Sequence, residues 1–101
     1  MKYDKLVRDK IPDVIRAEGR TPTVSIADEA EYWTRLKDKL REEVEELCHD
    51  ENEGEVADVL EVLDAIIAYK KFDRVKIGEI KQKKNQERGG FGGRVILVEA
   101  D

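Results

Sequence analysis

The chain has 101 residues, of which 43% are charged and 40% hydrophobic, and its formal net charge is −5. This length predicts one domain, residues 1–101, with a modest core, and the negative charge argues against non-specific nucleic-acid binding. One cysteine excludes an internal disulfide, and no apolar run approaches the ~20 residues of a membrane-spanning helix. We therefore expect a soluble cytoplasmic protein that binds neither nucleic acid nor membrane.

The first element expected is a short helix that begins after Asp9. Pro12 suits its first turn, Asp9 is a candidate cap, and Gly19 would end it. The segment 21–27, with the sequence TPTVSIA, follows and has the composition of a short strand.

Two long helices are expected in the middle of the chain. Asp28 is placed to cap the first, with Glu31 three residues on. Apolar residues recur at helical spacing in both helices, at Trp33, Leu36, Leu40, Val44 and Leu47 in the first and at Val56, Val59, Leu60, Leu63, Ile66 and Ile67 in the second. The polar stretch 50–54 between them is short enough to make the helices antiparallel, as a helical hairpin.

A last helix is expected to begin after Asp73 and to end near Gly89. The sequence GGFGG follows it and leads to residues 94–99 (RVILVE), a second strand candidate. This strand could pair with 21–27, within one chain or between chains, if the ribbon packs on the helices. The predicted fold is therefore mainly α, an antiparallel helical-hairpin core with flanking helices and a minor two-stranded β-ribbon.

Four acidic residues are expected to converge near the hairpin turn. Helical positions three or four apart share a face, so Glu43 and Glu46 lie along the edge of the first apolar stripe. Glu55 falls inside the apolar arc of the second helix and Asp58 on its border, and a glutamate on a buried face is costly unless it is paired or bound to a cation. Because Mg²⁺ prefers oxygen ligands, we predict a divalent-metal site at these four residues. The alternative is that they are merely solvated.

Three stretches resemble one known family. LREEVEEL (40–47) followed by EVADVLEVL (55–63) resembles the EExxE…ExxD signature of the all-α nucleoside triphosphate pyrophosphatases, which include MazG-type enzymes and phosphoribosyl-ATP pyrophosphohydrolase. The opening YDKLVRDKIPDVI and the late KKNQERGGF are similar to a small phosphoribosyl-ATP pyrophosphohydrolase-like branch of this family. The gap between the two acidic motifs is shorter than in the typical signature, which bears on the substrate pocket and dimer assembly more than on the metal site.

The resemblance implies hydrolysis of a nucleotide between its α- and β-phosphates, with Mg²⁺ or Mn²⁺ as cofactor and clearance of non-standard nucleotides as the role. By position, Glu42, Glu43 and Glu46 match the first acidic motif, while Glu55 and Asp58 match the second; in the family such acids coordinate Mg²⁺. Either Glu42 or Glu43 would serve as the catalytic base, and the sequence does not choose between them.

Basic residues are expected to bind the substrate phosphates. KKNQER resembles the late Lys/Asn/Arg element of the family, which selects Lys84, Asn85 and Arg88. Lys84 and Arg88 share a helical face, although the helix macrodipole also favours cations at this end without a ligand. In the N-terminal motif Arg8 is the best candidate, because its guanidinium fork suits phosphate.

Two other functions remain open from the sequence. One is the phosphoribosyl-ATP pyrophosphohydrolase step of histidine biosynthesis, and the other is a non-catalytic helical interaction module with a structural metal site. In each case we expect a homodimer or higher homo-oligomer, since so short a chain leaves apolar stripes for a second copy to cover.

Overall fold

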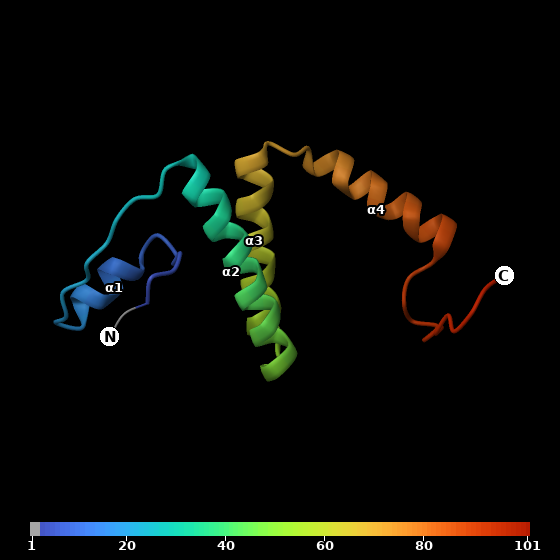
Figure 1. The fold of residues 1–101 in the computed structure, drawn as a ribbon, viewed down its shortest axis with the longest axis horizontal. Helices are drawn as coiled ribbons and strands as arrows, with labels where there is room; N and C mark the ends of the chain where they lie inside the picture. The colour runs from blue at the N-terminus through green and yellow to red at the C-terminus, as the bar shows by residue number, and fades with distance from the viewer. Residues whose placement is uncertain (1–2) are drawn as a thin grey trace. The chain divides into compact units, whose positions relative to one another are not determined.

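The computed structural model describes residues 3–101, and the chain is mainly helical. Its helices are α1 (Ile11–Ala17), α2 (Glu29–Asp50), α3 (Glu53–Lys70) and α4 (Arg74–Arg88) (Figure 1). Across residues 3–101, no helix combines the length and the apolar character needed to cross a membrane. The chain divides into two compact units, one ending at Lys70 and the other beginning at Lys71.

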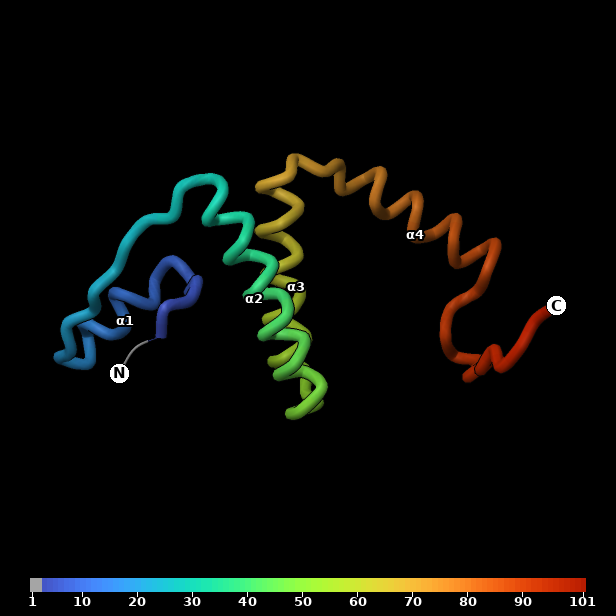
Figure 2. The backbone as a smooth tube through the Cα atoms, in the orientation of Figure 1, coloured from blue at the N-terminus to red at the C-terminus, as the bar shows by residue number. Residues whose placement is uncertain are grey.

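The first unit is built on α2 and α3, which pack against each other (Figure 2). Only Glu51 and Asn52 separate the two helices, so the chain reverses direction within two residues. Glu51 adopts the left-handed region (φ 38°), and its N–H donates to the carbonyl of Leu47 at 3.0 Å. Leu36, which is 1% exposed, and Val62, at 8%, are the buried apolar residues of this pair. The sharp reversal places the acidic ends of both helices close together.

An aromatic cluster joins the start of α2 to the end of α3. The rings of Trp33 and Tyr69 are stacked with centroids 5.9 Å apart, and Tyr32 meets Tyr69 edge-on at 5.2 Å. The Lys70 ammonium lies 4.2 Å from the centroid of a Trp33 ring, and the Tyr69 hydroxyl donates to the carbonyl of Glu29 at 3.0 Å. Trp33 therefore belongs to the packing of the helix pair, as its place in the apolar stripe predicts.

Side-chain caps fix where the longer helices begin. Asp28 accepts a hydrogen bond from the Glu31 N–H at 2.9 Å, and Asp73 accepts one from the Val75 N–H at 2.9 Å. The predicted starts of α2 and α4 are therefore confirmed. Asn52 caps α3 in the same way, because its side-chain oxygen accepts from the Glu55 N–H at 3.0 Å.

Asp9 does not cap α1. The N-cap residue is Lys10, which makes no side-chain capping bond. Pro12 lies in the first turn and has no N–H to be capped, while the Ile11 N–H donates to the carbonyl of Arg8 at 3.0 Å. A backbone carbonyl therefore accepts the hydrogen bond at the start of α1, and the Asp9 side chain does not.

The expected two-stranded ribbon is not found. Within residues 3–101 there is no strand, and both 21–27 and 94–99 are irregular. Ile26 is 94% exposed and Leu97 is 81% exposed, so neither segment packs its apolar side chains as the prediction required. A two-stranded ribbon is marginal without such packing, and β-prone composition alone does not supply it.

Candidate metal centre

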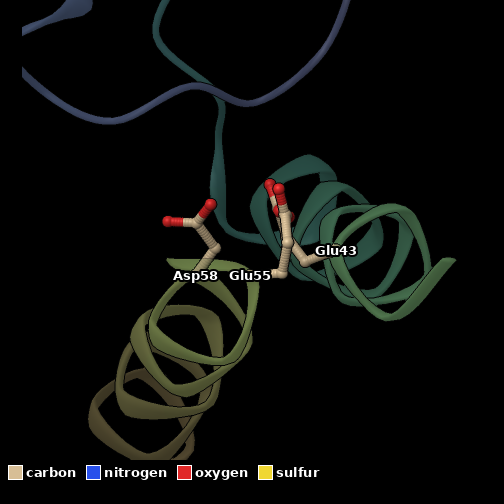
Figure 3. Close-up of side chains that lie close together, drawn as sticks. All are labelled: Glu43, Glu55 and Asp58. Atoms are coloured by element: carbon tan, nitrogen blue, oxygen red, sulfur yellow. The ribbon is translucent and has the colours of Figure 1, made fainter. Parts of the chain in front are cut away.

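Three carboxylates from α2 and α3 converge near the turn. Glu43 comes from α2, and Glu55 and Asp58 come from α3; one oxygen from each lies within 4.8 Å of the other two. Figure 3 shows the three side chains projecting to the same side of the helices, with Glu43 and Glu55 next to each other. We call these three residues the carboxylate cluster.

The local sequence explains why α3 presents two of these groups together. Asn52 sets the start of the helix, which puts Glu55 at its third position, where the backbone N–H is held by the Asn52 side chain. Asp58 follows three residues later and so shares a face with Glu55. The cap and the helical repeat together orient both carboxylates toward α2.

Two oxygens of the carboxylate cluster are buried without a hydrogen-bond partner. They are Oε2 of Glu43 and Oε2 of Glu55, and none of residues 3–101 donates to either. Glu43 is only 7% exposed as a whole residue. A buried charged oxygen that is left unpaired is costly. Hard divalent cations such as Mg²⁺ take carboxylate oxygens as ligands, so these donors fit such an ion.

Two cations contact the carboxylate cluster from its edges. Lys39 Nζ lies 3.2 Å from Oε1 of Glu43, and its side chain is only 16% exposed. Arg8 Nη2 donates to Oδ1 of Asp58 at 2.8 Å. Lys39 is not among the residues predicted from the sequence, although it lies four residues before Glu43 on one helix face, a spacing that favours such a pair.

Burial and mutual repulsion raise the pKa values of two carboxyl groups at this site. Burial raises the pKa of Glu55, and the charges of Asp58, Asp50 and Glu43 raise it further, in that order. The charge of Glu43 is the largest cause of the raised pKa of Glu46. Both shifts mean that added positive charge at the cluster would be favourable.

Glu46 does not belong to the carboxylate cluster, although it was predicted as a fourth ligand. Its side chain is exposed, whereas Glu43, one turn earlier on α2, is buried. The charges of Glu43 and Glu55 both raise the pKa of Glu46, so Glu46 lies near the carboxylate cluster without being one of its three members.

The structure separates the two candidate bases, Glu42 and Glu43. Lys5 Nζ donates to Oε1 of Glu42 at 2.8 Å, and Lys39 Nζ lies 3.5 Å from its Oε2. The hydrogen bond from Lys5 is the largest cause of the lowered pKa of Glu42. A carboxylate held in this way is a weaker base, and Glu42 is not in the carboxylate cluster, whereas Glu43 is.

The four predicted phosphate-binding residues fall in both units. Arg8 lies beside the carboxylate cluster and also has Nη1 3.8 Å from Oε1 of Glu61. Lys84, Asn85 and Arg88 lie on α4 in the second unit and are exposed. Lys84 and Arg88 are four residues apart and share a face of that helix, as their spacing predicts.

A small hollow lies next to the carboxylate cluster. Its volume is about 110 Å³, and it is lined by Asp4, Lys5, Leu6, Arg35, Asp38, Lys39 and Glu42. Ligand pockets for molecules of nucleotide size are usually several times larger, roughly 300–1,000 Å³. This hollow is therefore too small for a nucleoside.

Part of the chain is similar to a protein of known sequence. Over 43 residues, 43% of this chain, the sequence is 56% identical to an uncharacterized protein of Mycolicibacterium smegmatis. The matched stretch covers 44% of that relative, so the chain spans less than half of its length. No family model matches the chain, and no solved structure matches it.

Proposed function

We propose that this protein is a Mg²⁺-dependent nucleotide pyrophosphohydrolase. It would cleave a nucleoside triphosphate, or a related nucleotide, between the α- and β-phosphates to release a monophosphate and pyrophosphate. The observation that carries the proposal is the convergence of Glu43, Glu55 and Asp58 on one point, with a buried unpartnered oxygen on each of the two glutamates. The likeness of the EExxE…ExxD pattern to the all-α pyrophosphatases supports it.

The carboxylate cluster would hold the metal ion through the oxygens that lack partners. When bound, Mg²⁺ supplies positive charge that polarises phosphoryl oxygens and offsets the charge developing during phosphoryl transfer. Lys39 would keep Oε1 of Glu43 in place, so that the other oxygen of Glu43 stays directed into the cluster. Glu43 is also the better candidate to orient the attacking water, because Glu42 is held by Lys5.

Arg8, beside the cluster, would bind a phosphate group of the substrate. Lys84, Asn85 and Arg88 on α4 are the phosphate-binding candidates of the second unit. We propose clearance of non-standard nucleotides in the cytoplasm as the biological role. Assembly into a homodimer or larger homo-oligomer is supported by the exposed apolar face of α3, where Val56, Leu60 and Leu63 recur at helical spacing.

The test is a pyrophosphate-release assay over a panel of ribo- and deoxynucleoside triphosphates and phosphoribosyl-ATP, with and without Mg²⁺. We expect Mg²⁺-dependent release that the Glu55→Gln variant loses by about a hundredfold or more, because a neutral amide is a poor metal ligand. Glu53→Gln is the matched control, since Glu53 lies in the same first turn of α3 but is exposed; it should retain full activity.

Three outcomes distinguish the alternatives. A strong preference for phosphoribosyl-ATP over every triphosphate would identify the histidine-pathway reaction instead. Metal binding without turnover of any nucleotide would favour the non-catalytic interaction module. Full activity in both Glu55→Gln and Asp58→Asn would reject the carboxylate cluster as the active site.

A further inference from the structure

The N-terminal segment is tied to α2 by polar contacts. Arg35 Nη1 donates to the backbone carbonyl of Asp4 at 2.7 Å, and Arg35 Nη2 donates to the Asp4 carboxylate at 3.1 Å. One residue later, Lys5 donates to Glu42 at 2.8 Å. These contacts join residues more than thirty positions apart, and they place Arg8, three residues further on, beside the carboxylate cluster.

Arg8 contacts a member of the cluster directly. Its Nη2 donates to Oδ1 of Asp58 at 2.8 Å, and its Nη1 lies 3.8 Å from Glu61. The Arg8 side chain is 55% exposed. A guanidinium has five N–H donors in a planar fork, so Arg8 has donors to spare while it holds Asp58.

This contact has two opposing effects on a metal ion. A positive charge at hydrogen-bond distance from Asp58 repels a divalent cation that uses the same carboxylate. A phosphate group brought in with the metal would offer the guanidinium two oxygens in the geometry that its fork prefers. Arg8 therefore disfavours the metal alone and favours a metal accompanied by a phosphate anion.

We propose that Arg8 exchanges Asp58 for a phosphate group of the ligand when a divalent cation and a polyphosphate bind together. Asp58 is then released to the metal, and Arg8 becomes the residue that makes the carboxylate cluster selective for a metal–polyphosphate complex over the free metal ion. This inference rests on the proposed function, because it takes the polyphosphate class of ligand from it.

The competing role for Arg8 is a brace that only orients Asp58. Partners of this kind around metal ligands usually strengthen metal binding, and their removal weakens it. The two roles thus predict opposite signs for the effect of removing Arg8 on the affinity for metal alone. That difference makes the proposal testable without any measurement of turnover.

The experiment measures binding to Arg8→Gln by isothermal titration calorimetry. The ligands are Mn²⁺ alone, and Mg²⁺ with a non-hydrolysable triphosphate whose α,β-bridging oxygen is replaced by a methylene group. We expect Mn²⁺ alone to bind more tightly by about two- to fivefold, as for loss of an exposed ion pair. The triphosphate with Mg²⁺ should bind about tenfold or more weakly, since a charge-assisted bidentate contact is lost.

Two further variants control the comparison. Arg16→Gln removes the same charge from the same part of the chain, but Arg16 pairs with the exposed Asp13, at 3.0 Å, and not with a member of the carboxylate cluster among residues 3–101; both affinities should stay unchanged. Arg8→Lys keeps the charge and loses the fork, so it should preserve the Mn²⁺ affinity while weakening triphosphate binding. Circular dichroism would verify that each variant keeps the helical content of the parent.

Each remaining outcome overturns a defined part of the proposal. Weaker Mn²⁺ binding in Arg8→Gln would make Arg8 a brace for Asp58, and unchanged triphosphate binding would remove it from phosphate recognition. If the parent protein still hydrolyses nucleotides, either result rejects the proposed exchange of Arg8 from Asp58 to a phosphate group and leaves the proposed function intact. A parent protein that binds no triphosphate with any divalent cation would reject the proposed function, and the exchange with it.

Discussion

The ammonium of Lys39 lies 3.2 Å from Oε1 of Glu43, while Oε2 of the same buried carboxylate has no hydrogen-bond partner within residues 3–101. One oxygen of Glu43 is thus paired with a cation from its own helix, and the other is buried without a partner. This difference between the two oxygens of Glu43, with the proposed metal binding at the unpaired one, underlies the expected behaviour of several variants.

Replacement of Lys39 by methionine should destabilise the protein by about 1–3 kcal/mol, because it leaves the buried carboxylate of Glu43 without the cation that pairs with it. The free energy of unfolding in urea, without metal, measures this effect. Arg41→Met is the control on the same helix, since the pair between Arg41 and Asp38 is exposed and worth at most about 1 kcal/mol. Adding Glu43→Gln to Lys39→Met should recover stability, and a further loss would contradict the role given to Lys39.

Glu55→Gln should make the metal-free protein more stable at neutral pH while abolishing its stabilisation by Mg²⁺. Burial and neighbouring carboxylates raise the pKa of Glu55, so its charged form is unfavourable in the folded state and a neutral amide relieves this. Thermal unfolding with and without Mg²⁺ checks both effects. A parent Tm that does not respond to Mg²⁺ at millimolar concentration would argue against a metal site here.

The stability of the metal-free protein should rise as the pH falls from 7 toward about 5. Glu55 and Glu46 both have raised pKa values, so their destabilising charges are fully present at neutral pH and are lost as the pH falls through those values toward the ~4.3 of an unfolded glutamate. Glu42 acts in the opposite direction. Its pKa is lowered by Lys5, so its stabilising contribution disappears only below the unfolded value.

Urea unfolding at a series of pH values measures this dependence. Comparison of the parent protein with Glu55→Gln isolates the contribution of Glu55. The variant should show a smaller gain in the free energy of unfolding between pH 7 and pH 5. Saturating Mg²⁺ should also flatten the profile of the parent, because protons and metal compete for the same oxygens. A steeper gain in the variant than in the parent would contradict the origin assigned to the effect.

Asn52→Ala should lower both stability and metal affinity. Loss of an N-cap costs about 1 kcal/mol, and this cap holds the backbone N–H of Glu55 itself. Asp73→Ala removes the corresponding cap of α4 in the second unit and should leave metal affinity unchanged. Unfolding in urea and calorimetric titration with Mn²⁺ measure the two quantities. Equal losses of affinity in both variants would mean that the cap of α3 has no specific effect on the cluster.

The sequence predicted the helices well because their signals are local. Asp28 and Asp73 cap the residues that directly follow them, so a short stretch contains both the donor and the acceptor. The β-ribbon failed for the opposite reason. A strand at 21–27 requires a partner and a surface to pack on, and composition specifies neither.

The candidate site was predictable in part. Glu43, Glu55 and Asp58 follow from helix direction and from the short turn, and their oxygens do converge. The sequence does not show that Glu42 and Glu43 have different environments. That difference depends on the hydrogen bond from Lys5, which lies thirty-seven positions away from its partner Glu42. The exposure of Glu46, outside the three-residue cluster, likewise depends on how α2 is rotated about its own axis when it packs on α3. The spacing of the acidic residues alone does not determine this rotation.

The two-residue junction between α2 and α3 also limits how the gene can vary in length at this point. A deletion of Glu51 or Asn52 would force α3 to begin about 100° further round its axis or to lose its first turn, since each residue advances an α-helix by that angle. Residues 89–93 follow α4, and no helix or strand comes after them within residues 3–101, so a change of length there would rotate no packed helix. Insertions and deletions should therefore be well tolerated there and strongly selected against at the junction.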